Sequence, residues 1–150
     1  MIPGVAIYGA EMPSNVSFVF ISSRDTPEAR KKAERLAKAL KIRAYAFISL
    51  SQPLYTSVLN KINPKLVIPL DEEAYERFTK HAEASQGSLK FVRLSGYRYV
   101  AVAPPGLDVN ALAFLIAKIG SLSKFFINYR ARFFAELEKK RKNLKRKSVS

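Results

Sequence analysis

The sequence predicts an α/β protein, a single sandwich built on a mostly parallel sheet of about four to six strands. Apolar segments with strand character alternate with segments whose apolar residues recur every three or four positions, as in helices. This alternation is typical of parallel strands joined by right-handed helical crossovers. Near the end, Ser95-Gly96 separates two strand segments at the spacing of a β-hairpin, which we expect at an edge of the sheet. A long basic helix follows it.

The first third of the chain predicts three strands and one helix. Residues 4–8 predict a short edge strand, and residues 16–21 are apolar on both faces, as in a strand buried between two layers. Thr26 can cap the helix that follows, with Pro27 at its first position. Residues 42–50 then predict the next strand.

The middle of the chain continues the alternation. Residues 52–62 predict a short helix, and residues 66–69 predict a very short strand. Asp71 can cap a further helix, which we expect to reach about residue 84. The crossovers from strand to helix to strand therefore extend through this region.

The last third predicts a hairpin and a long helix. The hairpin strands cover residues 89–94 and 97–103, and Asp108 can cap the helix that follows. We expect residues 1–120 to form the α/β domain. Residues 121–150 predict an amphipathic helix that becomes a polybasic tail, packed on the domain or projecting from it.

The chain is strongly basic. Its 150 residues include 26 Lys and Arg against 12 Asp and Glu, a net charge of +14. Such a balance is the usual electrostatic footprint of a protein that binds nucleic-acid phosphates. No recognition-helix, zinc-finger or RNP motif is visible, so we expect non-catalytic recognition of backbone and shape, favouring RNA or a ribonucleoprotein. The candidate contacts are Lys31, Arg35, Lys38, Arg130, Arg132, Lys139, Lys140, Arg141, Lys142, Lys145, Arg146 and Lys147.

The alternative is an enzyme that uses the carboxyl edge of the sheet. Asp25 and Asp71 follow two predicted strands, and there they could hold Mg²⁺ for a nuclease or a nucleotide-handling enzyme. However, helix capping and a turn explain both residues without a metal. His81 is the single histidine, so one chain cannot build a metal site with two histidine ligands. The sequence thus favours a protein with no catalytic residue, metal or cofactor.

The same edge offers a seat for an anion. Ser22 and Ser23 precede the free N–H groups at the start of the helix capped by Thr26, and Arg24 lies beside them. A nucleotide or a backbone phosphate could bind there. The simpler interpretation is that these serines only cap and turn.

A third hypothesis is an assembly or interaction protein. Phe125 and Phe134 lie off the apolar stripe of the predicted C-terminal helix, where they could join two copies of the chain or bind a protein partner. The apolar runs are too short to span a bilayer, and the first residues do not resemble a signal peptide. We therefore expect a cytoplasmic protein. Abundant Lys and Arg suggest a thermophilic source.

Overall fold

The computed structural model describes most of the first 119 residues. The described residues are 4–62, 64–94, 99–119 and 139. The chain forms two compact units, residues 1–116 and residues 117–150. In the second unit, residues 117–119 and the exposed Lys139 are helical. The rest of the predicted C-terminal helix and tail lies outside the described residues.

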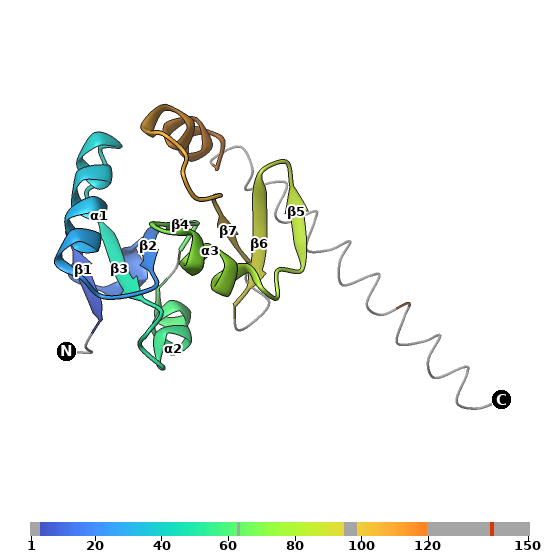
Figure 1. Cartoon of the computed structure of the whole chain (residues 1–150), viewed down its shortest axis with the longest axis horizontal. Coiled ribbons are helices and arrows are strands. Elements are labelled where there is room, and N and C mark those ends of the chain that lie inside the picture. The colour runs from blue at the N-terminus through green and yellow to red at the C-terminus, as the bar shows by residue number, and fades with distance from the viewer. Residues whose placement is uncertain (1–3, 63, 95–98, 120–138, 140–150) are drawn as a thin grey trace. The chain divides into compact units, whose positions relative to one another are not determined.

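The first unit is a mixed α/β fold around one sheet (Figure 1). The strands are β1 (Val5–Tyr8), β2 (Phe18–Ser22), β3 (Tyr45–Ser49), β4 (Leu66–Pro69), β5 (Ala84–Gln86), β6 (Leu89–Arg93) and β7 (Tyr99–Val102). The described residues form seven strands in the order β1-β3-β2-β4-β7-β6-β5. The four central strands, β3, β2, β4 and β7, are parallel. β1 and β6 run antiparallel to them.

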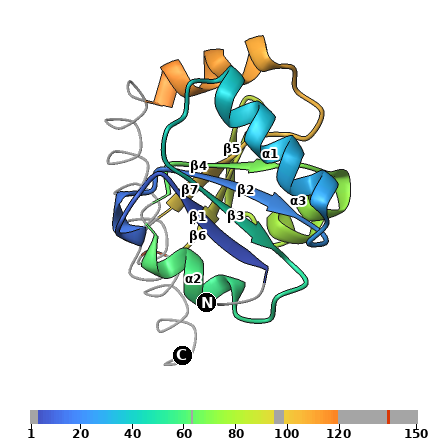
Figure 2. The same cartoon turned by 90° about the vertical axis from the view of Figure 1, so that its left-hand side faces the viewer.

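Helices cover both faces of this sheet. The helices are the short 3-10 helix η1 (Pro13–Asn15), α1 (Pro27–Ala39), α2 (Tyr55–Lys61) and α3 (Glu72–Thr79), followed by a helix from residue 109. α1 and the helix from residue 109 lie on one face, and α2 and α3 lie on the other (Figures 1 and 2). The prediction of an α/β fold with a mostly parallel sheet is therefore confirmed, but the described sheet has seven strands where about four to six were expected.

The two faces of the sheet carry different side chains, because successive strand residues point to opposite sides. The face under α2 and α3 is aliphatic, with Val19, Ile21, Ala46, Ile48, Val67, Val100 and Val102 packed in one cluster with Val58, Leu59, Ala74 and Phe78. The face under α1 is more aromatic. Phe20 and Phe47 are fully buried there, and the guanidinium of Arg30 in α1 lies 5.2 Å from the centre of the Phe47 ring.

The hairpin is confirmed, but its predicted place at the edge of the sheet is wrong. β6 pairs antiparallel with β7, while β7 pairs with β4 inside the sheet. The edge belongs to β5, which the sequence did not predict because three residues are too few to show an alternating pattern. α3 accordingly ends at Thr79 and does not reach residue 84.

The end of α1 contains a residue in the left-handed region. The N–H of Ile42 donates to the carbonyl of Ala37 at 2.8 Å, and the N–H of Lys41 donates to that of Lys38 at 3.2 Å. These two bonds form a Schellman motif, which requires a left-handed residue just after the helix. That residue is Lys41, with a φ of 57°. A lysine there pays a steric cost that glycine avoids.

We predict that Lys41→Gly raises the free energy of unfolding by about 1 kcal/mol, because glycine adopts the left-handed conformation without strain. Urea unfolding measures the change. Lys41→Ala is the control, since it removes the same charge but keeps a β-carbon. Equal stability of the two variants would show that relief of backbone strain is not the cause.

Candidate functional site

The topology places the expected ligand crevice between β2 and β4. The connection after β2 runs through α1 on one face of the sheet, and the connection after β4 runs through α3 on the other (Figure 2). In open α/β sheets, ligands bind beyond the carboxyl ends of two neighbouring strands whose connections diverge in this way. The loop after Ser22 and the start of α3 therefore line this switch point.

The carboxylate of Asp71 already occupies the donors in this crevice. Its Oδ1 accepts a hydrogen bond from the N–H of Ala74 at 2.8 Å, which caps α3. Its Oδ2 accepts from the N–H of Ser23 at 3.0 Å and from the hydroxyl of Ser22 at 3.3 Å. Burial alone would raise the pKa of Asp71, but the N–H bonds from Ser23 and Ala74 outweigh it and lower the pKa. One side chain thus joins the end of β2 to α3.

The structure brings the predicted anion-seat residues Ser22, Ser23, Arg24 and Thr26 together around a pocket of about 500 Å³. Their chemistry does not favour an anion. The Ser23 N–H is bonded to Asp71, and the Thr26 hydroxyl accepts from the N–H of Ala29 at 3.1 Å as a helix cap. The pocket is also lined by the acidic residues Glu28, Glu72 and Glu73. A phosphate would have to displace one carboxylate and lie near three others.

The two carboxylates considered for a metal have separate structural partners. Asp25 receives two hydrogen bonds from Arg30, at 2.7 and 2.9 Å, and these bonds lower the pKa of Asp25. Asp25 and Asp71 also line different pockets. Within the described parts of the chain, no group of three or more His, Cys, Asp or Glu residues could hold a metal ion.

The predicted cationic residues of α1 share one exposed face. Lys31, Arg35 and Lys38 are exposed and lie three or four residues apart. Lys38 pairs with Glu34 at 3.4 Å on the surface, whereas the Lys31 and Arg35 side chains have no partner among the described residues. This face is the largest group of exposed cations that the structure describes on one helix.

Charge is distributed unevenly between the segments that contain α1 and α3. Residues 27–43, which contain α1, carry seven Lys and Arg against two Glu, a net charge of +5. Residues 71–80, which contain α3, carry four acidic residues against two basic ones, a net charge of −2. An anionic polymer would therefore meet attraction over α1 and repulsion over α3.

The C-terminal candidates lie almost wholly outside the described residues. Lys139 is helical and exposed. The others are Arg130, Arg132, Lys140, Arg141, Lys142, Lys145, Arg146 and Lys147, together with Phe125 and Phe134. Among the helices that the structure describes, none has the length and apolar character needed to cross a membrane.

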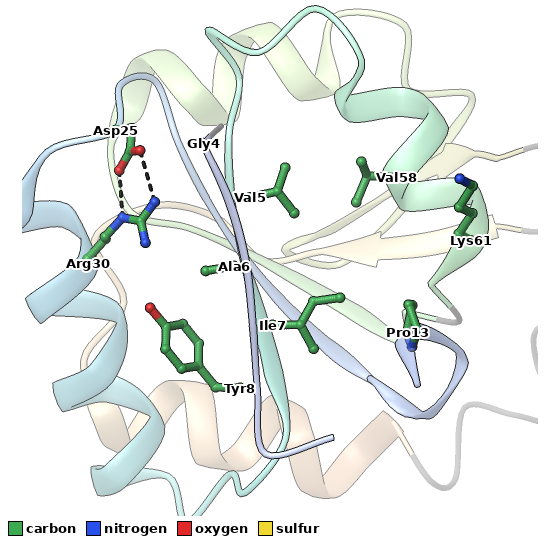
Figure 3. Close-up of a pocket in the computed structure, with 10 residues that line it drawn as sticks. All are labelled: Gly4, Val5, Ala6, Ile7, Tyr8, Pro13, Asp25, Arg30, Val58 and Lys61. Carbon is green, nitrogen blue, oxygen red and sulfur yellow. Dashed lines mark hydrogen bonds and ion pairs between the residues drawn. The ribbon is translucent and has the colours of Figure 1, made fainter. Parts of the chain in front are cut away.

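Sequence reasoning missed an aromatic group at the β1 edge, next to α1. The rings of Tyr8 and Tyr45 stack with centroids 4.9 Å apart and an angle of 26° between their planes, and Phe20 meets Tyr45 edge-on at 5.4 Å. A pocket of about 940 Å³ runs along β1, and its lining includes Tyr8, Asp25 and Arg30 (Figure 3). Residues 4–8 were predicted as a short edge strand, but the sequence did not show which face of that strand α1 covers.

Comparisons with protein-family models, curated proteins and solved structures found no match. We therefore infer function from the geometry and charge of this chain alone. Two surfaces emerge from that geometry: the cationic face of α1, defined by Lys31, Arg35 and Lys38, and the aromatic edge of β1, defined by Tyr8 and Tyr45.

We predict that Asp71→Asn lowers the free energy of unfolding at pH 7 by about 1–2 kcal/mol. Asparagine can still cap α3, but its neutral oxygen cannot replace both carboxylate oxygens. Because the pKa of Asp71 is lowered in the folded state, its contribution is complete above the unfolded pKa, near 3.8. It is lost as pH falls through the folded pKa. The difference in the free energy of unfolding between wild type and variant should therefore become smaller below about pH 4.

Urea unfolding across this pH range measures the effect. Asp108→Asn is the matched control, because Asp108 also caps a helix, accepting from the N–H of Ala111 at 2.7 Å, but bonds to no strand loop among the described residues. An equal loss of stability in both variants would contradict the bridging role of Asp71.

Proposed function

We propose that this protein binds nucleic acid without catalysis, favouring RNA over DNA, and that it recognises backbone and shape. The exposed cationic face of α1 carries the proposal. It combines Lys31 and Arg35, which have no partner in the described structure, with Lys38 on the same side of one helix. Protein surfaces usually intersperse charges of both signs, whereas residues 27–43 carry a net charge of +5.

The spacing on α1 suits a phosphate backbone. Residues four apart on a helix are separated by about 6 Å along its axis, a distance comparable to that between successive phosphates of one strand. Cations in such a row can neutralise neighbouring phosphates and release their counterions, which supplies most of the affinity in sequence-independent binding. The face therefore supports recognition of the backbone more directly than recognition of bases.

The C-terminal segment supports the same proposal through its charge. Residues 124–150 carry ten Lys and Arg against two Glu, a net charge of +8. Such a block would add phosphate contacts to those of α1. A cytoplasmic location among ribonucleoproteins is part of the proposal. The nuclease alternative gains no support, because Arg30 and the start of α3 already engage the two candidate carboxylates.

We predict that the double variant Lys31→Gln, Arg35→Gln weakens RNA binding about ten- to fiftyfold near 0.1 M salt, because two phosphate contacts are lost. The slope of log K against log salt should become shallower by about 1.4–1.8. Fluorescence anisotropy titrations of a labelled RNA at several salt concentrations measure both quantities.

The matched control is Lys65→Gln, Lys80→Gln, which removes the same charge from exposed side chains that have no partner in the described structure. Both residues lie outside α1. Lys80 follows the last residue of α3, within the segment 71–80 that carries a net negative charge. We expect a much smaller loss of affinity. Equal losses of affinity in the two double variants would show that only net charge matters. Unchanged RNA binding by the Lys31→Gln, Arg35→Gln variant would refute the proposed interface.

A further inference from the structure

The aromatic edge of β1 has an incomplete stack. In the register of the sheet, Tyr8 pairs with Tyr45, and Tyr45 pairs with Phe18 on the next strand. The Tyr8 ring lies parallel to the Tyr45 ring, so one face of Tyr8 is covered. Tyr8 is nevertheless 40% exposed, the least buried aromatic residue of this row. β1 pairs only with β3 among the described strands, so no described strand continues the row beyond Tyr8.

The space beside Tyr8 is open and partly polar. The pocket of about 940 Å³ that runs along β1 is lined on this side by Ala6, Tyr8, Asp25 and Arg30 (Figure 3). Arg30 is fixed by its two bonds to Asp25 and lies over the Phe47 ring, which pairs in register with the small Ala6. This side of the pocket therefore presents the aromatic ring of Tyr8 next to the ion pair of Arg30 and Asp25.

The cationic face of α1 lies next to this edge. Arg30, Glu34 and Lys38 follow one another at intervals of four residues, so they form one row along the flank of α1 nearest β1. Arg30 lies over the Phe47 ring and lines the β1 pocket together with Tyr8, which places this end of the row beside the aromatic edge (Figure 3). Lys31 and Arg35 form the next row outward. Lys38 belongs both to this row and to the cationic face, so the cationic face adjoins the flank of α1 that Arg30 shares with Tyr8.

We propose that Tyr8 stacks with an unpaired base of a single-stranded nucleic acid, whose phosphates bind the cationic face of α1. The base would continue the row from Tyr45 through Tyr8, in the offset-parallel arrangement that aromatic rings prefer. Stacking of this kind tolerates any base sequence, which agrees with the lack of a base-reading motif. This inference rests on the proposed function and adds to it a preference for single strands over duplexes.

The test compares three substitutions at one position in the intact chain. Tyr8→Phe keeps an aromatic ring, Tyr8→Leu keeps apolar volume without a ring, and Tyr8→Ala removes both. The probe is an oligouridylate of about ten nucleotides, with an RNA duplex for comparison. We expect Tyr8→Phe to bind like the wild type, whereas Tyr8→Leu and Tyr8→Ala bind the single strand about five- to a hundredfold more weakly. Binding of the duplex should change little in all three.

A second probe tests the wild type directly, so that a poorly folded variant cannot obscure the result. It is an oligonucleotide of the same length with intact phosphates but no bases. The wild type should bind it more weakly than the oligouridylate, by the factor seen for Tyr8→Ala. Equal binding of both probes, with Lys31→Gln, Arg35→Gln still weakening both, would overturn the stacking inference and leave the proposed function in place. A wild type that binds neither probe nor the duplex would overturn both.

Discussion

The carboxylate of Asp71 is the constraint on which the rest of the structure depends. It caps α3 with one oxygen and holds the loop after β2 with the other. A ladder joins the parallel strands β2 and β4, and the Asp71 side chain adds a link from the loop after β2 to the start of α3, where their connections diverge. It also takes up the Ser23 N–H and the Ser22 hydroxyl at the crevice in which open α/β sheets usually bind ligands. The binding surfaces that we propose lie outside this crevice, on outer surfaces of the fold.

Those outer surfaces have complementary properties. The cationic face of α1 presents Lys31 and Arg35 without partners in the described structure, whereas residues 71–80, which contain α3, carry a net negative charge. Long-range attraction would orient an anionic polymer toward α1 before any contact forms. Tyr8, which lines a pocket with Arg30 of α1, would offer a short-range aromatic surface whose contribution to affinity does not fall with salt as that of phosphate contacts does. The two contributions can be measured separately.

The sequence predicted much of this fold because its signals are local. Thr26 and Asp71 were recognised as helix caps, and both accept the expected N–H bonds. What it could not predict depends on contacts between distant segments. The bond from Ser23 to Asp71 requires β2 to lie beside β4, and the position of Tyr8 requires β1 to pair with β3. The three residues of β5 carry too little pattern to be read alone. The boundary between units and the role of the C-terminal segment stay predictions.

Lysine footprinting tests the central claim most directly, because it reports on the wild-type chain without substitutions. The protein is acetylated with a limiting reagent, with and without saturating single-stranded RNA, and each lysine is quantified by mass spectrometry. We expect RNA to protect Lys31 and Lys38 on α1, together with lysines of the C-terminal segment, while Lys65 and Lys80 react as before. Protection confined to the C-terminal lysines, or equal protection of all exposed lysines, would contradict the assignment of α1 as the nucleic-acid interface.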